Sequence, residues 1–411
     1  MDKINLVRKL PDMLMGEKLE QALQILPDYT ENIRNENEAV RLIELSELYT
    51  VFIPNQMSKE IYSKLYLALL RSLQKKETQL AVQQLNENAK AVRGKEYSSI
   101  LGGADSFTII GASGIGKTSA ISRAIDLMAG NEIIEIEEPY MKVIPCVLVQ
   151  CPFDSSIKGM LLEILRVVDS KLDTKYYEKA VRARATLDML IGSVSSVCLQ
   201  HIGLLIVDEI QNVVNSKNGK NLIGSLTQLI NNSGISIAMV GMPESRVFFE
   251  QAFQLARRSL GLYFNAMDYN EAFHQFCKTL FQFQYVKNKT QINDAIIHWF
   301  YEHSQGNISI VISLLHDAQE IAICDGRETL DMETLNDAYK KRLTLLHSFM
   351  SPKKKPQTAR VKNACLDLQE RTDIEIDEEL SVTTLILRAK NECRDVVEFL
   401  SKYIIVERVV I

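Results

Sequence analysis

The residues with the clearest chemical role form a glycine-rich segment, GASGIGKT, at positions 111–118. The segment follows an apolar run, opens a stretch with helical periodicity and fits the pattern GxxxxGK(S/T). Its glycines let successive backbone N–H groups turn toward an anion, Lys117 can reach the β and γ phosphates of a nucleotide, and the Thr118 hydroxyl can bind Mg²⁺. The cofactors that we predict are therefore ATP and Mg²⁺. The predicted nucleotide-binding residues are Gly111, Ser113, Gly114, Ile115, Gly116, Lys117, Thr118 and Ser119.

Two acidic residues, Asp208 and Glu209, end a second apolar run, GLLIVDE. An aspartate at the carboxyl end of a central strand can hold Mg²⁺ through water, and a neighbouring glutamate can orient or deprotonate an attacking water. We therefore predict Thr118 and Asp208 as metal ligands and Glu209 as a catalytic residue. Because both acids are present, the pattern favours an ATPase, which hydrolyses ATP to ADP and phosphate, over a protein that only binds the nucleotide.

Adjacent arginines, Arg257 and Arg258, lie in the segment QLARRSLG. Most adjacent arginines are surface residues, and that is one interpretation of the pair. The other is an arginine finger that reaches the γ-phosphate held by a neighbouring subunit. The position of the pair between two apolar runs favours the finger. We therefore predict that Arg257 or Arg258 is catalytic, that the chain forms a homo-oligomer, and that hydrolysis depends on assembly.

These motifs need a sheet to position them. Short apolar runs that alternate with amphipathic helices are typical of a parallel sheet in an α/β domain. The predicted strands are 106–111, 142–151, 203–208, 235–241 and 262–267. After Asp268 the pattern contains only helical segments, near 270–285, 290–304, 308–324 and 331–347. The predicted fold is thus an α/β P-loop domain with a parallel central sheet, followed by an all-helical lid domain.

Changes of composition divide the chain into five predicted regions. A basic linker is predicted from prolines and basic residues without acids, and an acidic tail from a run of carboxylates. The regions are a helical N-terminal adaptor region (1–100), the nucleotide-binding α/β domain (101–268), the helical lid domain (269–350), the basic linker (351–366) and the acidic C-terminal tail (367–411).

Charge limits how this protein could bind nucleic acid. The chain has 47 basic and 52 acidic side chains and a net charge of −5, which excludes a protein that is basic over its whole surface. Residues 158–184, however, carry seven basic side chains against four acidic ones, and such a segment can follow the phosphates of double-stranded DNA. An ordinary solvated pair of helices is the alternative interpretation. The predicted DNA-binding residues are Lys158, Lys175, Lys179, Arg182 and Arg184.

The cysteines and histidines predict no metal site. The seven cysteines form no CxxC pair and the six histidines form no HExxH motif, so we interpret the cysteines as buried, reduced thiols. The sequence has no stretch of 18 apolar residues, and its first residues lack the apolar run of a secretory signal. We therefore expect a cytoplasmic protein with no membrane partner.

Taken together, the motifs resemble those of the TnsC/TniB-type AAA+ ATPases, which regulate DNA transposition in bacteria. The resemblance covers about residues 45–350 and includes VFIPN at positions 51–55. The other similar segments are IIGASGIGKTSAISR, VQCPFDSSIKGM, HIGLLIVDEIQNV, NNSGISIAMVGMPES, QLARRSLG and SQGNISIVISLL.

The resemblance implies an AAA+ fold and a role as an ATP-dependent matchmaker in the bacterial cytoplasm. It implies that the protein oligomerises as a ring or helical filament on double-stranded DNA, links a target-selection protein of the TniQ/TnsD type to the transposase subunits, and activates the transposase. ATP hydrolysis would control assembly and disassembly. The resemblance also implies that Arg257 or Arg258 acts in trans, that Lys158 and the basic residues after it face DNA, and that Gln211 relays between the nucleotide and the DNA face.

Two departures from the family pattern bear on the rate of hydrolysis. Many relatives have threonine where this chain has Met242, a position at which AAA+ ATPases sense the γ-phosphate, so Ser245 or a neighbour has to act in its place. Ser309 occupies a position at which other AAA+ proteins often have a second-sensor arginine. Both departures predict slow hydrolysis. Two alternative functions stay open: a nucleotide-locked DNA scaffold with negligible turnover, and an origin-recognition or signalling AAA+ ATPase.

Overall fold

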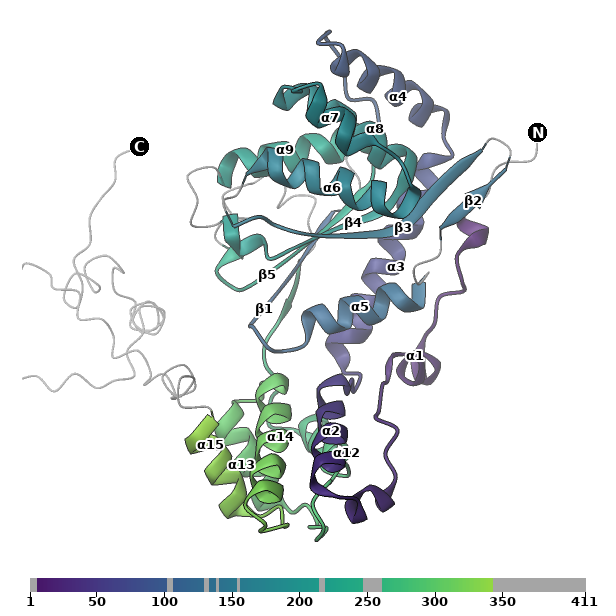
Figure 1. The fold of residues 1–411 in the computed structure, drawn as a ribbon. Coiled ribbons are helices and arrows are strands. Elements are labelled where there is room, and N and C mark those ends of the chain that lie inside the picture. Colours follow the sequence, from purple (N-terminus) through teal and green to yellow (C-terminus); the bar gives the residue numbers. More distant parts are fainter. Residues whose placement is uncertain are drawn as a thin grey trace, which may run out of the picture. The chain divides into compact units, whose positions relative to one another are not determined.

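The computed structural model describes residues 6–101, 106–128, 133–137, 140–153, 156–213, 219–246 and 261–342 (Figure 1). All of these residues fall within one compact unit, Met1–Ser351. The predicted arginine pair, Arg257 and Arg258, lies outside the described residues, as do the predicted linker (351–366) and tail (367–411).

A six-stranded sheet forms the centre of the described part. Its order is β2-β3-β4-β5-β1-β6, and every neighbouring pair is parallel except β2 and β3. The strands are β1 Phe107–Gly111, β2 Ile134–Ile136, β3 Met141–Gln150, β4 Ile202–Asp208, β5 Ser236–Gly241 and β6 Leu262–Phe264. The five predicted strands are confirmed. The sequence missed β2, because a three-residue edge strand among acidic residues carries no apolar run.

Helices cover both faces of this sheet (Figure 1). The alternation along β5 shows why, since Ala238 and Val240 pack into one core, whereas Ile237 and Met239 pack into the other. On the first face lie α3 Gln56–Lys76 and α5 Lys117–Met128. On the second face lie α6 Ile157–Leu172, α8 Leu187–His201 and α9 Gly219–Ser233. Two further helices border this second layer, α7 Tyr176–Arg182 beside α6 and α4 Gln79–Val92 against α8.

The N-terminal segment shares its apolar residues between two cores. Its elements before α3 are η1 Leu6–Lys9, α1 Gly16–Leu23, η2 Glu31–Asn35, α2 Glu38–Leu45 and η3 Ser46–Thr50. Leu6, Leu19 and Leu23 join the core beneath α3 and α5, whereas Leu45 and Leu48 join the core of the C-terminal helices. Within the described residues the predicted adaptor region therefore has no core of its own, and the predicted domain boundaries stay predictions.

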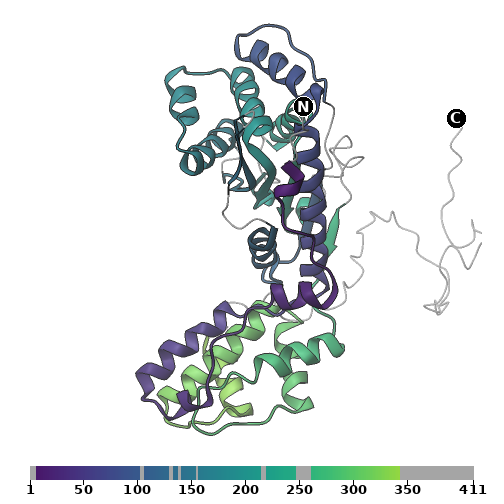
Figure 2. The same ribbon diagram turned by 90° about the vertical axis from the view of Figure 1, so that its right-hand side faces the viewer.

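Four helices after the sheet form the lid: α12 Glu271–Leu280, α13 Asp294–Ser304, α14 Ile308–Cys324 and α15 Met332–Arg342. They confirm the four predicted helical segments. Asn270, Asn293 and Asn307 each cap the following helix through a side-chain oxygen, which fixes where α12, α13 and α14 begin. In Figure 2 the purple N-terminal helix α2 lies along the green lid helices, and α2 packs directly on α14.

Two sequence-based expectations concern membrane-spanning helices and the burial of the cysteines. No single helix among the described residues is long and apolar enough to cross a membrane; α13 and α14 pass that test only as a pair, and the pair is bent by 119°. Of the described cysteines, Cys146, Cys151, Cys198 and Cys277 are buried as predicted, and burial raises the pKa of Cys146 and Cys198 to about 12. Cys324 is exposed, so the prediction was wrong there, because α14 ends at this residue and the chain turns out of the lid core.

Candidate nucleotide-binding site

The glycine-rich segment joins β1 directly to α5. Gly114 and Gly116 have φ angles of +77° and +91°, a region that favours glycine. Gly111 is required for another reason, because a Cβ atom there would lie 2.7 Å from the backbone oxygen of Phe264 in β6. Positive φ angles at these glycines are the backbone geometry that lets N–H groups turn toward an anion, as expected for a P-loop.

The Lys117 side chain, which follows these glycines, folds back into the loop. Lys117 Nζ donates to the backbone oxygens of Gly111 and Ala112, at 2.7 Å each. Burial lowers the pKa of Lys117, and the nearby carboxylates of Asp208 and Glu209 partly offset this effect. The Lys117 ammonium is therefore inside the loop, where it can exchange these carbonyls for phosphate oxygens.

The two predicted metal ligands lie side by side. Thr118 Oγ1 donates to Asp208 Oδ2 at 3.3 Å, and the Asp208 side chain is largely buried at the carboxyl end of β4. A hydroxyl and a carboxylate are hard oxygen donors, which suit Mg²⁺. This donor set fits the ion that the P-loop implies.

Glu209 lies in a sharp turn directly after β4. Its φ angle is +58°, an unusual value for a residue with a side chain. The turn is closed by hydrogen bonds on both sides, because Glu209 N donates to Asp208 Oδ1 at 2.8 Å and Asn212 N donates to the Glu209 backbone oxygen at 3.0 Å. The turn places both carboxylates on the wall of one pocket.

The position predicted to sense the γ-phosphate is built differently from the family pattern. Met242 lines the pocket, and its backbone N–H donates to Gln211 Oε1 at 3.2 Å. Ser245, one of the substitutes that we expected beside a neighbouring residue, is fully buried outside the pocket lining, and its hydroxyl has no partner among the described residues. The neighbour that brings a polar side chain to this position is Gln211.

The lid touches the P-loop through the first residues of α14. Asn307 caps α14 with its Oδ1 and donates from Nδ2 to the backbone oxygen of Ser113 at 2.8 Å. Ser309 N donates to the backbone oxygen of Gly114 at 3.0 Å, and Ser309 lines the pocket. Where other AAA+ proteins often have a second-sensor arginine, the N-terminus of α14 is thus in direct contact with the loop.

The resulting pocket has a volume of about 310 Å³ and a lining of two chemical kinds. The polar lining includes the P-loop, Asp208, Glu209 and Gln211. The apolar lining comes from the N-terminal segment, the start of α3 and the lid, namely Tyr49, Val51, Phe52, Ile53, Met57, Phe276, Ile308 and Ile312. No chemical motif in the sequence points to these residues. The one local signal was VFIPN, whose Asn55 caps α3 and lines the pocket.

The predicted DNA-binding residues fall into two places. Lys158 lies in the first turn of α6, whereas Lys175, Lys179, Arg182 and Arg184 lie in or beside α7, the next helix along the chain. The five residues thus come from two different helices.

The basic residues of α7 form an exposed face. Lys175, Lys179 and Arg182 are spaced by four and three residues, so they lie on one side of the helix, and all are exposed. Arg182 forms an ion pair with Glu178 in the same helix. Within the described residues, Lys175, Lys179 and Arg184 form no ion pair, so their charges are available to an external anion.

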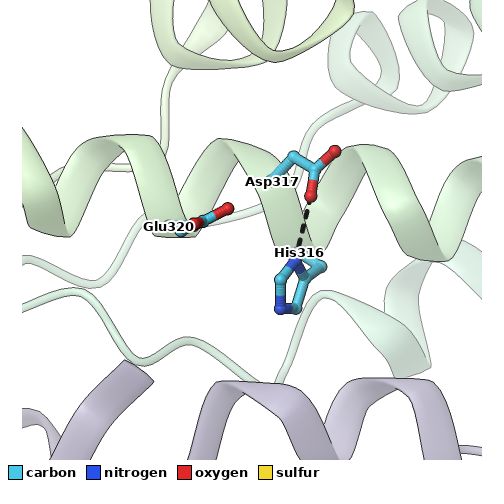
Figure 3. Close-up of side chains that lie close together, drawn as sticks. All are labelled: His316, Asp317 and Glu320. Atoms are coloured by element: carbon cyan, nitrogen blue, oxygen red, sulfur yellow. Dashed lines mark hydrogen bonds and ion pairs between the residues drawn. The ribbon is translucent and has the colours of Figure 1, made fainter. Parts of the chain in front are cut away.

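Three side chains of types that can bind a metal ion lie together elsewhere, on α14: His316, Asp317 and Glu320 (Figure 3). Their ligand atoms are within 4.8 Å of one another. His316 Nδ1 lies 3.0 Å from Asp317 Oδ1, and Glu320 accepts a hydrogen bond from Arg342 at 3.2 Å. Because each of these groups already has a protein partner, we interpret the cluster as a polar network that joins α14 to α15.

Comparison with known proteins supports the fold. Residues 99–249 match the family model of the AAA domain. A search of curated proteins finds no match to the sequence. The predicted α/β P-loop fold, with a mostly parallel sheet and a helical region after it, is confirmed.

Solved structures that are similar to this chain have low sequence identity to it. The Aeropyrum pernix ORC1 protein in complex with DNA is 16% identical, over 63% of this chain and 63% of that one, with a TM-score of 0.41. The chain therefore spans less than two thirds of the length of that protein. Drosophila ORC bound to DNA is 13% identical over 85% and 73%, with a TM-score of 0.44. A Walker-type ATPase of Pyrococcus abyssi is 11% identical over 65% and 72%, with a TM-score of 0.38. From the family match and the geometry of the loop, residues 99–249 hold an AAA-type P-loop ATPase domain.

Proposed function

We propose that this protein is an ATP-dependent regulator of DNA transposition that oligomerises on target DNA and links a target-selection protein to the transposase. The observation that carries the ATP-dependent part is the single pocket in which the P-loop, Asp208 and Glu209 meet residues of the lid. The transposition part rests on the resemblance to TnsC/TniB-type ATPases in the motifs around that pocket.

We propose a step for each residue of the polar lining. Lys117 would bind the β and γ phosphates in place of the two carbonyls that it now contacts. Thr118 and Asp208 would hold Mg²⁺, which neutralises charge on the phosphates during transfer. Glu209 would accept a proton from the attacking water as that water reaches the γ-phosphate. An arginine of a neighbouring subunit, Arg257 or Arg258 in our proposal, would stabilise the charge that develops on the γ-phosphate.

The apolar lining suggests how the nucleotide would control assembly. A purine base packed against Ile53 of the N-terminal segment and Ile312 of the lid would bury apolar surface of both segments. Phosphates bound to the P-loop would at the same time lie against the contact between Asn307 and Ser113. ATP and ADP would therefore hold the lid differently, and the lid orientation would decide whether neighbouring subunits pack together.

DNA binding is assigned to the exposed face of α7. Each phosphate that Lys175, Lys179 or Arg184 neutralises releases a counterion, so affinity should fall steeply with salt. Substitution of these three residues by alanine should flatten the plot of log affinity against log salt concentration by up to about one unit per lost phosphate contact. A matched control is Lys18→Ala, Lys95→Ala and Lys278→Ala together, which removes the same charge at exposed positions elsewhere. An unchanged slope in the α7 variant would place the DNA contact on another surface.

The experiment that tests the proposed function is electron microscopy of the full chain with duplex DNA and a non-hydrolysable ATP analogue. We expect rings or filaments on DNA that require the nucleotide, and we expect none from Lys117→Ala. ATP-dependent filaments of that variant, or a wild-type chain that never assembles, would refute the proposal. The transposition part is tested by the neighbouring genes, which should encode a transposase and a target-selection protein.

A second candidate function is a nucleotide-locked DNA scaffold that binds ATP and turns it over negligibly. The apolar side chain of Met242 on the pocket wall favours it. Phosphate release with and without DNA separates the two functions. Turnover that DNA stimulates and that Glu209→Gln reduces to a small residual rate supports the ATPase, whereas no turnover in any condition supports the scaffold.

A further inference from the structure

Gln211 is the polar side chain that joins the ends of the two central strands. It lies in η4 Ile210–Val213, directly after the acidic pair that ends β4, and it lines the pocket. Its Oε1 accepts from Met242 N at 3.2 Å, and its Nε2 donates to Glu209 Oε2. One amide thus connects the carboxylate that faces the pocket to the backbone at the end of β5.

The chemistry of the two partners fixes the orientation of this amide. A backbone N–H needs an acceptor and a carboxylate needs a donor, so the Gln211 oxygen must face Met242 and its nitrogen must face Glu209. Glutamate at this position could accept from Met242 but could not donate to Glu209. Methionine, which has a similar length, could do neither.

The end of β5 is built to receive this side chain. A Cβ atom on Gly241 would lie 2.6 Å from Ile210 Cγ2 and 3.2 Å from Gln211 Oε1. Glycine at this position therefore lets the segment after β4 rest against β5. The parallel register of β4 and β5, with Val207 opposite Met239, brings the two strand ends to the same edge of the sheet.

The Gln211 amide also has a remaining donor. Its nitrogen carries two hydrogens, and no partner for the second one lies within the described residues, whereas the side chain faces the pocket. A donor at the end of the strand next to the catalytic carboxylate is what a γ-phosphate sensor supplies, and the Met242 side chain cannot supply it.

We propose that Gln211 is the positioning residue of ATP hydrolysis in this chain: held by the Met242 backbone, it orients the Glu209 carboxylate and takes the place of the sensor side chain that is missing at position 242. The proposal rests on the ATPase activity assigned above. It deepens that activity, because it makes the rate of the chemical step depend on an amide next to the catalytic acid.

The first test compares two variants of nearly equal side-chain length in the full chain, with duplex DNA, ATP and Mg²⁺. Gln211→Glu keeps the acceptor for Met242 N–H but removes the donors and places a carboxylate against Glu209. Gln211→Met removes both hydrogen bonds without adding charge. We expect kcat to fall about 100-fold in Gln211→Glu and at least about tenfold in Gln211→Met. KM and the affinity for a non-hydrolysable analogue should change less than about threefold in both.

The second test asks whether Gln211 acts through Glu209. In a Glu209→Gln background, Gln211→Glu should cause no further loss of kcat, because residues that act as a unit are not additive. Gln275→Glu, an exposed position on α12, is the matched control and should leave kcat unchanged. The unfolding midpoint of each variant shows whether the chain is folded, and Gln211→Met keeps the test valid if the added charge of Gln211→Glu unfolds the protein.

The outcomes separate this inference from the proposed function. Wild-type turnover together with unchanged kcat in Gln211→Glu and Gln211→Met overturns the role of Gln211 and leaves the ATPase standing. A rise of KM at constant kcat overturns it too, because it would mean that Gln211 only binds the nucleotide. A wild-type chain with no turnover in the assembled state overturns both.

Discussion

A buried ion pair between α2 and the lid gives the sharpest test of how the pocket is held together. Arg41 is fully buried and makes two hydrogen bonds to the Glu328 carboxylate, at 2.7 Å each, and one to the backbone oxygen of Tyr285 at 3.0 Å. A few residues later the same segment supplies Tyr49 and Val51 to the pocket wall. The ion pair therefore fixes one wall of the pocket to the lid that forms the other.

The perturbation is Arg41→Met, which keeps most of the apolar stem and removes the charge. Breaking a buried ion pair costs about 3–5 kcal/mol, because the remaining charge stays buried. Glu328 would keep a hydrogen bond from Lys287 N at 3.2 Å and the Lys287 ammonium at 3.4 Å. We therefore expect the lower end of the range, a loss of about 3 kcal/mol in the free energy of unfolding.

Urea unfolding and titration with a fluorescent ATP analogue measure the two consequences. We expect a lower unfolding midpoint and an affinity for the analogue that falls by at least about tenfold, since a detached α2 would take the pocket wall with it. The control is Arg34→Met, which breaks an exposed ion pair with Glu31 and should cost less than about 1 kcal/mol. If Arg41→Met unfolds like the control and binds the analogue like the wild type, the pair does not hold the pocket.

The pH dependence offers an independent check. The hydrogen bonds from Arg41 hold the pKa of Glu328 below its ordinary value of 4.5. A carboxyl group with a depressed pKa in the folded state stabilises the protein at neutral pH, and this stability is lost as the pH falls below 4.5 through the folded-state pKa. The difference in free energy of unfolding between wild type and Arg41→Met should therefore shrink in acid. A constant difference would contradict the assignment.

Two further predictions concern a buried lysine and a glycine of the P-loop. Lys76 is fully buried and donates to the backbone oxygens at the end of α8, and burial lowers its pKa to about 7. Because the unfolded chain holds this proton up to a higher pH, stability should rise from pH 7 upward by at most about 1.4 kcal/mol per pH unit, and chemical unfolding of Lys76→Met at pH 7 and 9 should lack this rise. Gly114→Ala and Gly94→Ala both place alanine at positive φ, at a cost of about 1 kcal/mol, but only at Gly114 would the Cβ lie 2.7 Å from Asn307. Calorimetric titration with the analogue should thus show weaker binding for Gly114→Ala alone, and equal affinities would contradict a lid contact that supports the P-loop.

The strands and the P-loop were predictable from the sequence because each is a local pattern. β4 and β5 are buried along their whole length, and a strand buried on both faces must be an unbroken apolar run. The P-loop needs its glycines, lysine and threonine in consecutive positions, so its chemistry and its spacing appear together. β2 shows the limit, since its three residues pair with β3 only at the sheet edge and leave little trace in composition.

The walls of the pocket were not predictable, because they depend on residues that are far apart in the chain. Asn307 and Ser113 are 194 residues apart, and Arg41 and Glu328 are 287 residues apart. Each of these side chains has an ordinary local role: Asn307 caps a helix, and Arg41 belongs to an amphipathic one. Only the packing of the N-terminal segment on the lid gives them a role at the site.

Met242 shows how an inference along one segment can miss a residue that is close in space. The sequence indicates that a polar sensor is missing after β5, and a search along the same segment leads to Ser245 or a neighbour, whereas the fold buries Ser245 outside the pocket. The backbone N–H of Met242, a polar group that every residue except proline has, instead contacts the side chain of Gln211 in η4, just after the neighbouring strand β4. The ends of neighbouring parallel strands therefore have to be considered together and not one segment at a time. With Gln211 as the proposed source of the amide, an apolar side chain at position 242 is compatible with hydrolysis.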